Sequence, residues 1–283
     1  MTKLALGTVQ FGLDYGISNK MGQVSFEEVS KILKLAKESS IHTLDTANSY
    51  GNSEKVLGNA GVNDFKIVTK TAPLCSGVNN VLQSFHQSLK DLNVTTVDGV
   101  LIHNIDDTKD IEFDVLFKAF KKLKQDKVIN KIGFSTYTPE QVEFLMENFD
   151  FDLIQVPFNV FDTRLVEGGQ LKALKKKNIE IHARSVFLQG LLLSFDSLSD
   201  YFLIWEGQFK RYQEMVREKD LSLLEYALNF VLNTQEFDKI LVGVDNVKQL
   251  TDIINAYKLD VKLNAFKINN INLLNPSNWR LNE

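Results

Sequence analysis

Short apolar segments alternate along the chain with longer segments in which apolar residues recur at helical spacing. The short segments are rich in leucine and β-branched residues and end at polar residues, which is typical of strands buried on both faces. Such strands are predicted over residues 4–9, 42–46, 66–70, 99–103, 131–135, 153–157, 179–185 and 239–244. Helices are predicted over residues 26–39, 53–59, 78–91, 112–126, 139–148, 164–177, 221–233 and 246–257.

Eight strands, each followed by a helix, predict a parallel sheet closed into a barrel. Ser25 with Glu28 has the spacing of a capping box, and Pro139 follows Thr138 where a helix is expected to begin. No linker rich in Pro, Gly or Ser divides the chain, so we predict an α/β fold, a single (β/α)8 TIM barrel over residues 1–283. The alternative, an open doubly wound sheet, usually carries a G-x-G-x-x-G turn, a spacing that residues 7–12 (GTVQFG) lack.

Two segments depart from the alternation of strands and helices. Residues 191–220 follow the seventh predicted strand, with a helix predicted over 206–219 and Tyr201, Phe202 and Trp205 ahead of it. Long insertions at such a place usually cover a functional site, although an apolar plug against the outer helices fits nearly as well. The tail over residues 273–283 is compatible with a lid or with a strap across the barrel.

Composition and charge narrow the range of partners. The 283 residues carry 32 Lys and Arg against 36 Asp and Glu, a net charge of −4, which gives no electrostatic basis for binding nucleic acid or an anionic membrane. Cys75 is the only cysteine, which excludes a disulfide within the chain and a cysteine-ligated zinc site. The first residues lack the apolar core of a signal peptide, and no apolar stretch approaches the ~18 residues of a membrane span. A cytoplasmic protein is therefore expected.

Three polar residues stand at the ends of consecutive predicted strands and a fourth lies in the loop after the first of these strands, where barrel enzymes carry their chemistry. They are Asp45, Tyr50, Lys70 and His103. Each alone has an ordinary interpretation: a turn cap, a loop aromatic, a surface lysine and a core histidine. Together they favour a site, because Asp45 and Lys70 on neighbouring strands can pair and a nearby ammonium makes the Tyr50 phenol a better proton donor.

The residues around these positions resemble the aldo-keto reductase family. Residues 44–54 (LDTANSYGNSE) are similar to its Asp/Tyr signature, and Lys70 in IVTK with His103 in LIH completes its tetrad. Residues 133–135 (GFS), Gln155 and residues 185–192 extend the likeness over nearly the whole chain. The resemblance implies reduction of a small-molecule aldehyde or ketone by hydride transfer from NAD(P)H, without a metal.

The resemblance also implies roles for individual residues. Tyr50 would donate a proton to the carbonyl oxygen, Lys70 and Asp45 would tune Tyr50, and His103 would orient the carbonyl. Ser135 and Gln155 would bind the nicotinamide carboxamide, residues 185–189 would meet the pyrophosphate, and Asp252 would face the adenine. The residues implied to hold the cofactor are Thr8, Ser135, Gln155, Arg184, Ser185, Phe187, Gln189, Gly243, Lys248 and Asp252.

Departures from the family pattern bear on the cofactor. Arg184 stands where the family commonly stacks a tyrosine on the nicotinamide, and a planar guanidinium can also stack. Thr136 replaces an asparagine that is frequent after the serine of the fifth strand. Residues 241–249 lack the Lys, Ser and Arg with which many members hold the 2′-phosphate, which leaves Lys248 as the one candidate. The expected cofactor is NADP, with NAD as the alternative.

Other functions remain as alternatives. A Schiff-base aldolase using Lys70 would need a neutral lysine, which pairing with Asp45 opposes. A barrel that binds the dinucleotide as a redox sensor or subunit, with little turnover, would keep the same residues. The four histidines show no metal-binding spacing.

The substrate class is suggested by the start of the chain. Residues 6–12 resemble bacterial family members of sugar and surface-polysaccharide metabolism, which favours a sugar-type carbonyl. The sequence leaves the oligomeric state open.

Overall fold

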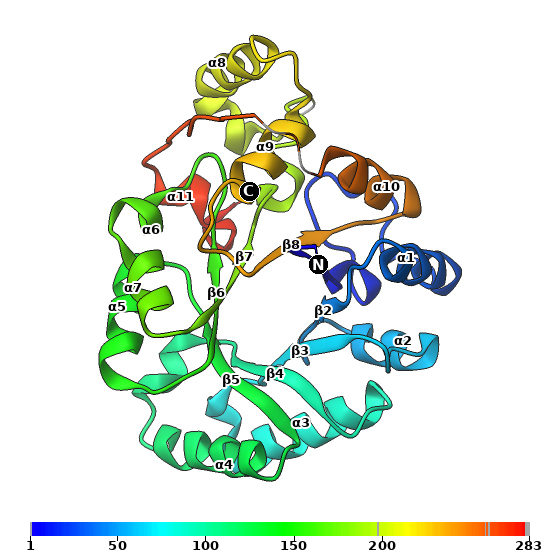
Figure 1. Cartoon of the computed structure of the whole chain (residues 1–283), viewed down its shortest axis with the longest axis vertical. Coiled ribbons are helices and arrows are strands. Elements are labelled where there is room, and N and C mark those ends of the chain that lie inside the picture. The colour runs from blue at the N-terminus through cyan, green and yellow to red at the C-terminus, as the bar shows by residue number, and fades with distance from the viewer. Residues whose placement is uncertain (1, 197, 258, 260, 281–283) are drawn as a thin grey trace.

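The computed structural model describes residues 2–196, 198–257, 259 and 261–280. Eight parallel strands form a closed barrel in the order of the sequence, with helices around it (Figure 1). Because β8 also pairs with β1, the predicted (β/α)8 barrel is confirmed. The strands, whose predicted ends differ by at most two residues, are β1 (Leu4–Gly7), β2 (Thr43–Asp45), β3 (Lys66–Lys70), β4 (Val97–Ile102), β5 (Ile129–Ser135), β6 (Leu153–Pro157), β7 (Glu180–Arg184) and β8 (Lys239–Gly243).

The predicted helices are present with one exception, and the short α11 (Ile271–Leu274) was not predicted. The helix predicted over residues 164–177 is wrong, because Gly168 and Gly169 divide it into two, and Gly169 has a left-handed φ of 80°. The helices are α1 (Phe26–Glu38), α2 (Ser53–Ala60), α3 (Val78–Asp91), α4 (Phe113–Gln125), α5 (Pro139–Asn148), α6 (Arg164–Glu167), α7 (Gln170–Lys176), α8 (Glu206–Arg217), α9 (Leu223–Leu232), α10 (Val247–Ala256) and α11 (Ile271–Leu274).

Two predicted helix starts are present, but only one has a complete capping box. Thr138 accepts from the Gln141 backbone N–H and Gln141 returns the bond, so α5 begins as expected at Pro139. Ser25 Oγ accepts from Glu28 N at 3.3 Å, which caps α1. The Glu28 carboxylate, however, accepts from the backbone N–H of Val247 at 2.8 Å and so joins α1 to the start of α10.

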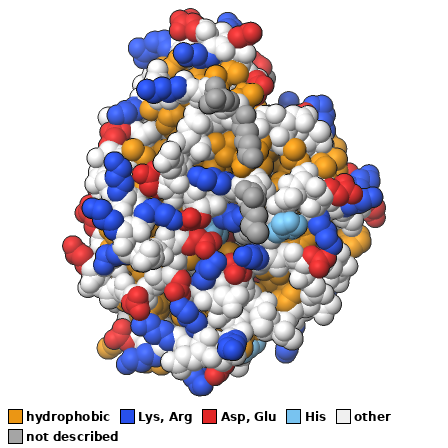
Figure 2. Space-filling view, viewed as in Figure 1, with side chains coloured by type: hydrophobic (Ala, Val, Ile, Leu, Met, Phe, Trp, Pro, Cys, Tyr) orange, Lys and Arg blue, Asp and Glu red, His pale blue; other side chains and the backbone are white. Residues whose placement is uncertain are grey.

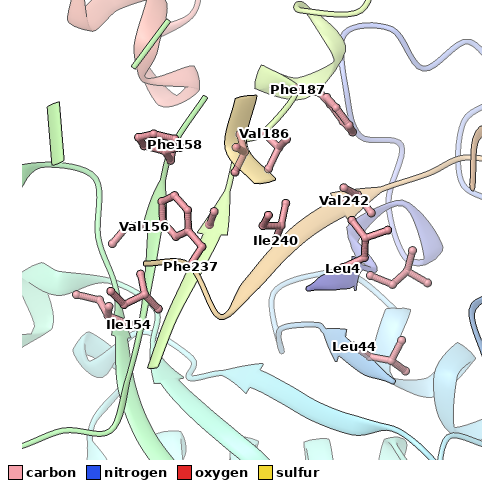
Figure 3. Close-up of a cluster of buried hydrophobic side chains, with 14 of the residues drawn as sticks. Leu4, Leu44, Ile154, Val156, Phe158, Val186, Phe187, Phe237, Ile240 and Val242 are labelled. Carbon is pink, nitrogen blue, oxygen red and sulfur yellow. The ribbon is translucent and has the colours of Figure 1, made fainter. Parts of the chain in front are cut away.

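The outer faces of the strands build the main hydrophobic core. Leu4, Leu44, Ile154, Ile240 and Val242 belong to four strands and are at most 2% exposed (Figure 3). They pack in the layer between the barrel and its helices. The alternate residues of the same strands must therefore point into the barrel, since side chains two apart share a face.

Inside the barrel, an apolar layer lies beneath a polar one. Val68, Leu101 and Leu153 form a separate, fully buried cluster from β3, β4 and β6. In β3 to β6, the residue two positions after each member of the apolar layer points to the same interior face and is polar. The successive pairs are Val68 and Lys70, Leu101 and His103, Gly133 and Ser135, and Leu153 and Gln155.

The insertion between β7 and α9 is mainly a packing element. Phe209 and Tyr212 of α8 are at most 1% exposed, and the Phe209 ring stacks 4.6 Å from that of Phe195. The prediction of an apolar plug therefore describes most of the segment, although Leu193 reaches a cavity at the barrel mouth. In Figure 1, α8 lies at the edge of the molecule, beyond α9.

The C-terminal tail packs on this insertion and also reaches the cavity. Tyr201 Oη donates to the carbonyl of Asn272 at 2.9 Å, and the Trp279 ring lies edge-on to Phe202, with 5.0 Å between centroids. Pro276 and Ser277 line the cavity, so the tail borders the site as a strap. Residues 197 and 281–283 of the two predicted segments lie outside the described residues.

Candidate active site

A cavity of about 580 Å³ opens at the carboxyl ends of the strands. It collects most of the residues that the sequence singled out. Thr8 and Lys248 lie outside its lining: the Thr8 hydroxyl is buried against Asp45 O at 2.9 Å, and the Lys248 side chain is 82% exposed. The predicted residues that line the cavity are Asp45, Tyr50, Lys70, His103, Ser135, Gln155, Arg184, Ser185, Phe187, Gln189, Gly243 and Asp252.

A buried ion pair forms the floor of this cavity. Lys70 Nζ lies 2.6 Å from Asp45 Oδ2 and donates to the carbonyl of Thr46 at 2.9 Å. Gln155 Nε2 donates to the other Asp45 oxygen at 2.7 Å. Burial alone would lower the pKa of Lys70, but the Asp45 carboxylate and the Tyr50 phenol outweigh it and raise that pKa. Lys70 therefore stays charged, which argues against the neutral amine of a Schiff-base aldolase.

Tyr50 lies directly over this lysine. The Nζ of Lys70 is 4.8 Å from the centre of the Tyr50 ring, and the ring stands edge-on to that of His103 at 6.2 Å. Two glycines permit this position: a Cβ on Gly12 would lie 1.9 Å from Tyr50 O, and one on Gly51 would lie 2.3 Å from Gly12 O. The loop carrying Tyr50 is thus held against the loop after β1.

His103 is neutral at physiological pH. Burial, followed by the positive charge of Lys70, lowers the pKa of His103 to about 4. Its backbone N–H donates to Thr71 Oγ1 at 3.2 Å, and its Nδ1 lies 3.4 Å from Ser49 Oγ. A neutral imidazole can offer one N–H donor to a ligand in the cavity without bringing a charge.

The lowered pKa of His103 predicts that the free energy of unfolding depends on pH. Because the folded-state pKa of about 4 lies below the reference value of about 6.5, the unfolded chain binds more protons between these pH values. We expect the free energy of unfolding to fall as the pH drops from about 6.5 to about 4, relative to a His103→Gln variant. Urea unfolding across this window measures the difference, and NMR titration of the imidazole checks the pKa. Titration of His103 near 6.5 would contradict the expectation.

Arg184, at the end of β7, meets a residue that the sequence did not suggest. Its guanidinium carbon lies 4.1 Å from the centre of the Tyr137 ring, and its Nη2 donates to Thr136 O at 2.9 Å. Its Nη1 donates to Ser185 Oγ at 3.1 Å. One face of the guanidinium is thus taken by Tyr137, and stacking of the other face on a nicotinamide stays a prediction.

The loop after β7 has an unusual backbone. Ser185, Leu188 and Gln189 have φ values of 58°, 47° and 55°, in the left-handed region that non-glycine residues rarely adopt. Such conformations gather at functional sites, where the surrounding structure holds them. Ile17 N, in the loop after β1, donates to Gln189 O at 3.1 Å and fixes one wall of the cavity. The pyrophosphate contacts assigned to this loop stay a prediction.

Several lining residues were missed by the sequence reasoning. They include Gln10, Tyr15, Tyr137, Asp245 and Ser277. Gln10, Tyr137 and Asp245 follow the ends of β1, β5 and β8 by two or three residues, so a systematic search beyond every strand end would have found them. Ser277 reaches the cavity because the C-terminal tail runs past it, and no local sequence pattern predicts the course of the tail.

Three residues that line the cavity each have a buried polar atom without a hydrogen-bond partner among the described residues. Gln10 Oε1, Arg184 Nε and Asp245 Oδ1 have no hydrogen-bond partner within the described part of the chain. Unpaired buried polar atoms are rare in folded proteins, so each calls for an explanation. The cavity volume lies in the range of about 300–1,000 Å³ common for cofactor sites. Both observations fit a bound dinucleotide.

The described residues show neither a metal cluster nor a membrane helix. They contain no group of three or more His, Cys, Asp or Glu side chains arranged to hold a metal ion. None of the helices formed by these residues combines the length and apolarity needed to cross a membrane.

On the face drawn in Figure 2, Lys and Arg side chains intermingle with Asp and Glu without a continuous basic patch.

Comparison with known proteins agrees with this geometry. A family model described as "Aldo/keto reductase family" matches residues 3–275. The chain belongs to this family. The resemblance seen in residues 44–54 and in the tetrad is thereby confirmed at the level of the family, which supports an oxidoreductase acting on small carbonyl compounds.

Individual relatives are distant. An uncharacterized oxidoreductase of Bacillus subtilis, YqkF, is 24% identical over 282 residues, covering 90% of this chain and 91% of that protein. The L-glyceraldehyde 3-phosphate reductase of Escherichia coli K12 is 24% identical over 289 residues, covering 86% and 83%. The aldo-keto reductase AKR11C1 of Bacillus halodurans, in its holo form, has a TM-score of 0.75 at 21% identity, covering 92% of this chain and 88% of that chain. The glycerol dehydrogenase AKR11B4 of Gluconobacter oxydans has a TM-score of 0.71 at 22% identity, covering 93% and 88%.

Proposed function

We propose that the protein reduces an aldehyde or ketone with NAD(P)H. The observation that carries the proposal is the convergence of Asp45, Tyr50, Lys70 and His103 at one end of a cofactor-sized cavity. When bound, the dinucleotide supplies the hydride that adds to the carbonyl carbon. The protein residues must then deliver a proton to the carbonyl oxygen and hold the substrate in place.

Tyr50 is the proton donor in this proposal. As the carbonyl C=O becomes CH–OH, the phenolic proton passes to the carbonyl oxygen and the O–H electron pair stays on Tyr50. Lys70, 4.8 Å from the ring centre, stabilises the resulting phenolate by its charge. Asp45 keeps that charge in place through the 2.6 Å ion pair. The phenol recovers its proton from water that enters the cavity.

His103 positions the carbonyl group. Its neutral ring lies beside Tyr50, so an N–H of the imidazole and the phenolic O–H can both point at one carbonyl oxygen. A charged imidazolium would compete with Tyr50 for the role of acid, whereas a pKa of about 4 prevents this at neutral pH. His103 thus serves as a hydrogen-bond donor rather than as the acid.

The remaining cavity residues are assigned to the dinucleotide. Because Gln155 Nε2 is bonded to Asp45, its Oε1 is the atom suited to accept from a carboxamide, with Ser135 beside it. Arg184 would lie against the nicotinamide, residues 185–189 would meet the phosphates, and Gly243 and Asp252 would lie at the adenosine end. Thr8 and Lys248 leave this set, since neither lines the cavity.

A hydroxylated, sugar-type carbonyl is the substrate class we favour. Relatives include proteins named L-glyceraldehyde 3-phosphate reductase and L-galactose dehydrogenase, and a structural neighbour is named glycerol dehydrogenase.

The proposed location is the cytoplasm. Cys75 is free and exposed, which suits a reducing compartment of this kind.

The proposal is tested by following cofactor absorbance with a panel of small aldehydes, ketones and aldoses. Stopped-flow mixing of the enzyme and reduced cofactor with each carbonyl should show oxidation of the cofactor and formation of one alcohol per cofactor oxidised. Tight binding of the cofactor without oxidation by any carbonyl would instead favour the redox-sensor alternative. Absence of binding would contradict both functions.

A further inference from the structure

We propose that the cavity beyond β8 accepts an adenosine ribose with a free 2′-hydroxyl, so that the enzyme uses NADH in preference to NADPH, with Asp245 as the discriminating residue. This inference rests on the proposed function, because it concerns the same dinucleotide site. It selects one of the two cofactors that the sequence left open.

The position of the adenosine end follows from the layout of the cavity. Tyr50, Lys70 and His103 come from the β2–β4 side of the barrel, so the nicotinamide must lie there. Phosphates in barrels of this kind commonly bind at the loops after the seventh and eighth strands. Beyond those loops, the cavity is lined by Asp245 and by residues of α10, which stands beside β8 in Figure 1. The adenosine half therefore meets α10.

Asp245 is built to accept a hydrogen bond at this end. Its Oδ1 is buried and has no donor within the described residues. Its Oδ2 accepts from Gln249 Nε2 at 3.2 Å, while Gln249 Oε1 accepts from the Asp245 backbone N–H at 2.7 Å. The side chain of Gln249 thus holds the carboxylate in place and leaves Oδ1 without a donor from the part of the chain that the structure describes.

A ribose hydroxyl satisfies that oxygen, whereas a phosphate does not. A hydroxyl carries an O–H donor, and a carboxylate binding a ribose 2′-hydroxyl is the arrangement that selects NAD in other dinucleotide folds. A phosphate monoester at neutral pH is an anion with mostly acceptor oxygens. Placed beside Asp245, it would add repulsion and leave the carboxylate without a donor.

The surrounding charges add to the same preference. The cavity-lining residues of β8, of α10 and of the loop between them are Leu241, Gly243, Asp245, Gln249, Asp252 and Ile253, which include two carboxylates and no Lys or Arg. Lys248, the one cation nearby in sequence, is 82% exposed and pairs with Asp252 at 2.6 Å.

The end of β8 supplies no cation either. Gly243, the last residue of β8, lines the cavity and brings no side chain to it.

Binding of NADH and NADPH to the full-length protein, measured by fluorescence titration without substrate, tests the inference. We expect the Kd for NADH to be at least about 10-fold lower than that for NADPH, since a factor of 10 requires only about 1.4 kcal/mol. Asp245→Asn keeps the shape but removes the charge, and it should reduce the NADPH/NADH ratio of Kd values several-fold. Asp245→Ser serves as a second variant if the first folds poorly. Asp114→Asn, with the same change in net charge on α4, should leave the ratio unchanged.

The outcomes separate this inference from the proposed function. Equal binding, or tighter binding of NADPH, would overturn the NADH preference while leaving the reductase proposal intact. An NADH preference that neither Asp245 variant alters would overturn the role of Asp245. Failure of both dinucleotides to bind would overturn the proposed function itself.

Discussion

Replacing Tyr50 by phenylalanine is expected to lower kcat for carbonyl reduction by about 10²- to 10⁴-fold, the range for loss of a general acid. The Kd of the reduced cofactor should stay the same, because the ring that lies over Lys70 is retained and only the hydroxyl is lost. Single-turnover kinetics at saturating cofactor measures the chemical step directly.

Tyr15→Phe is the matched control for this variant. Tyr15 also lines the cavity, so its replacement removes a phenol from the same site without touching the Lys70 environment. We expect kcat to change far less than in Tyr50→Phe. Comparable losses in both variants would mean that the cavity merely needs a hydroxyl, and near-normal turnover of Tyr50→Phe would rule out Tyr50 as the proton donor.

The fold could be predicted because every barrel strand is buried on both faces. Residues such as Ile154 and Leu153 lie on opposite faces of β6 and are both fully buried, so apolar residues recur on both faces of a strand rather than on one. The break between α6 and α7 was missed because the apolar period continues across Gly168 and Gly169. The Glu28 contact to Val247 was missed because it joins elements 219 residues apart.

The candidate site could be predicted where a strand sets the direction of a side chain. Lys70 and Gln155 each follow an interior apolar residue by two positions, and this spacing alone places them in the barrel mouth. For loop residues, a position just after a strand indicates the barrel mouth but does not predict the contacts made there. The contact of Tyr137 with Arg184, and the orientation of Asp245 by Gln249, depend on loop paths that only the structure gives.

Lys70→Met is expected to lower the free energy of unfolding by about 3–5 kcal/mol, the usual cost of removing one partner from a buried ion pair. Asp45 and Lys70 are 3% and 2% exposed, so the carboxylate left behind is poorly solvated. Urea unfolding measures the loss. Lys122→Met breaks the exposed Lys122–Asp126 pair and should cost within about 0.5 kcal/mol.

A double variant and a pH series show whether the loss comes from the unpaired charge. In Asp45→Asn with Lys70→Met, the amide can still accept from Gln155, so part of the lost stability should return. The raised pKa of Lys70 means that the pair stabilises the fold fully below the reference value of about 10.4, and that this contribution fades only as the pH rises through the higher folded-state pKa. The difference between the wild-type protein and Lys70→Met should therefore stay constant from about pH 7 to pH 9. A difference that shrinks across this range would show that Lys70 loses its proton there, and a lysine that is already neutral could not stabilise a phenolate at Tyr50.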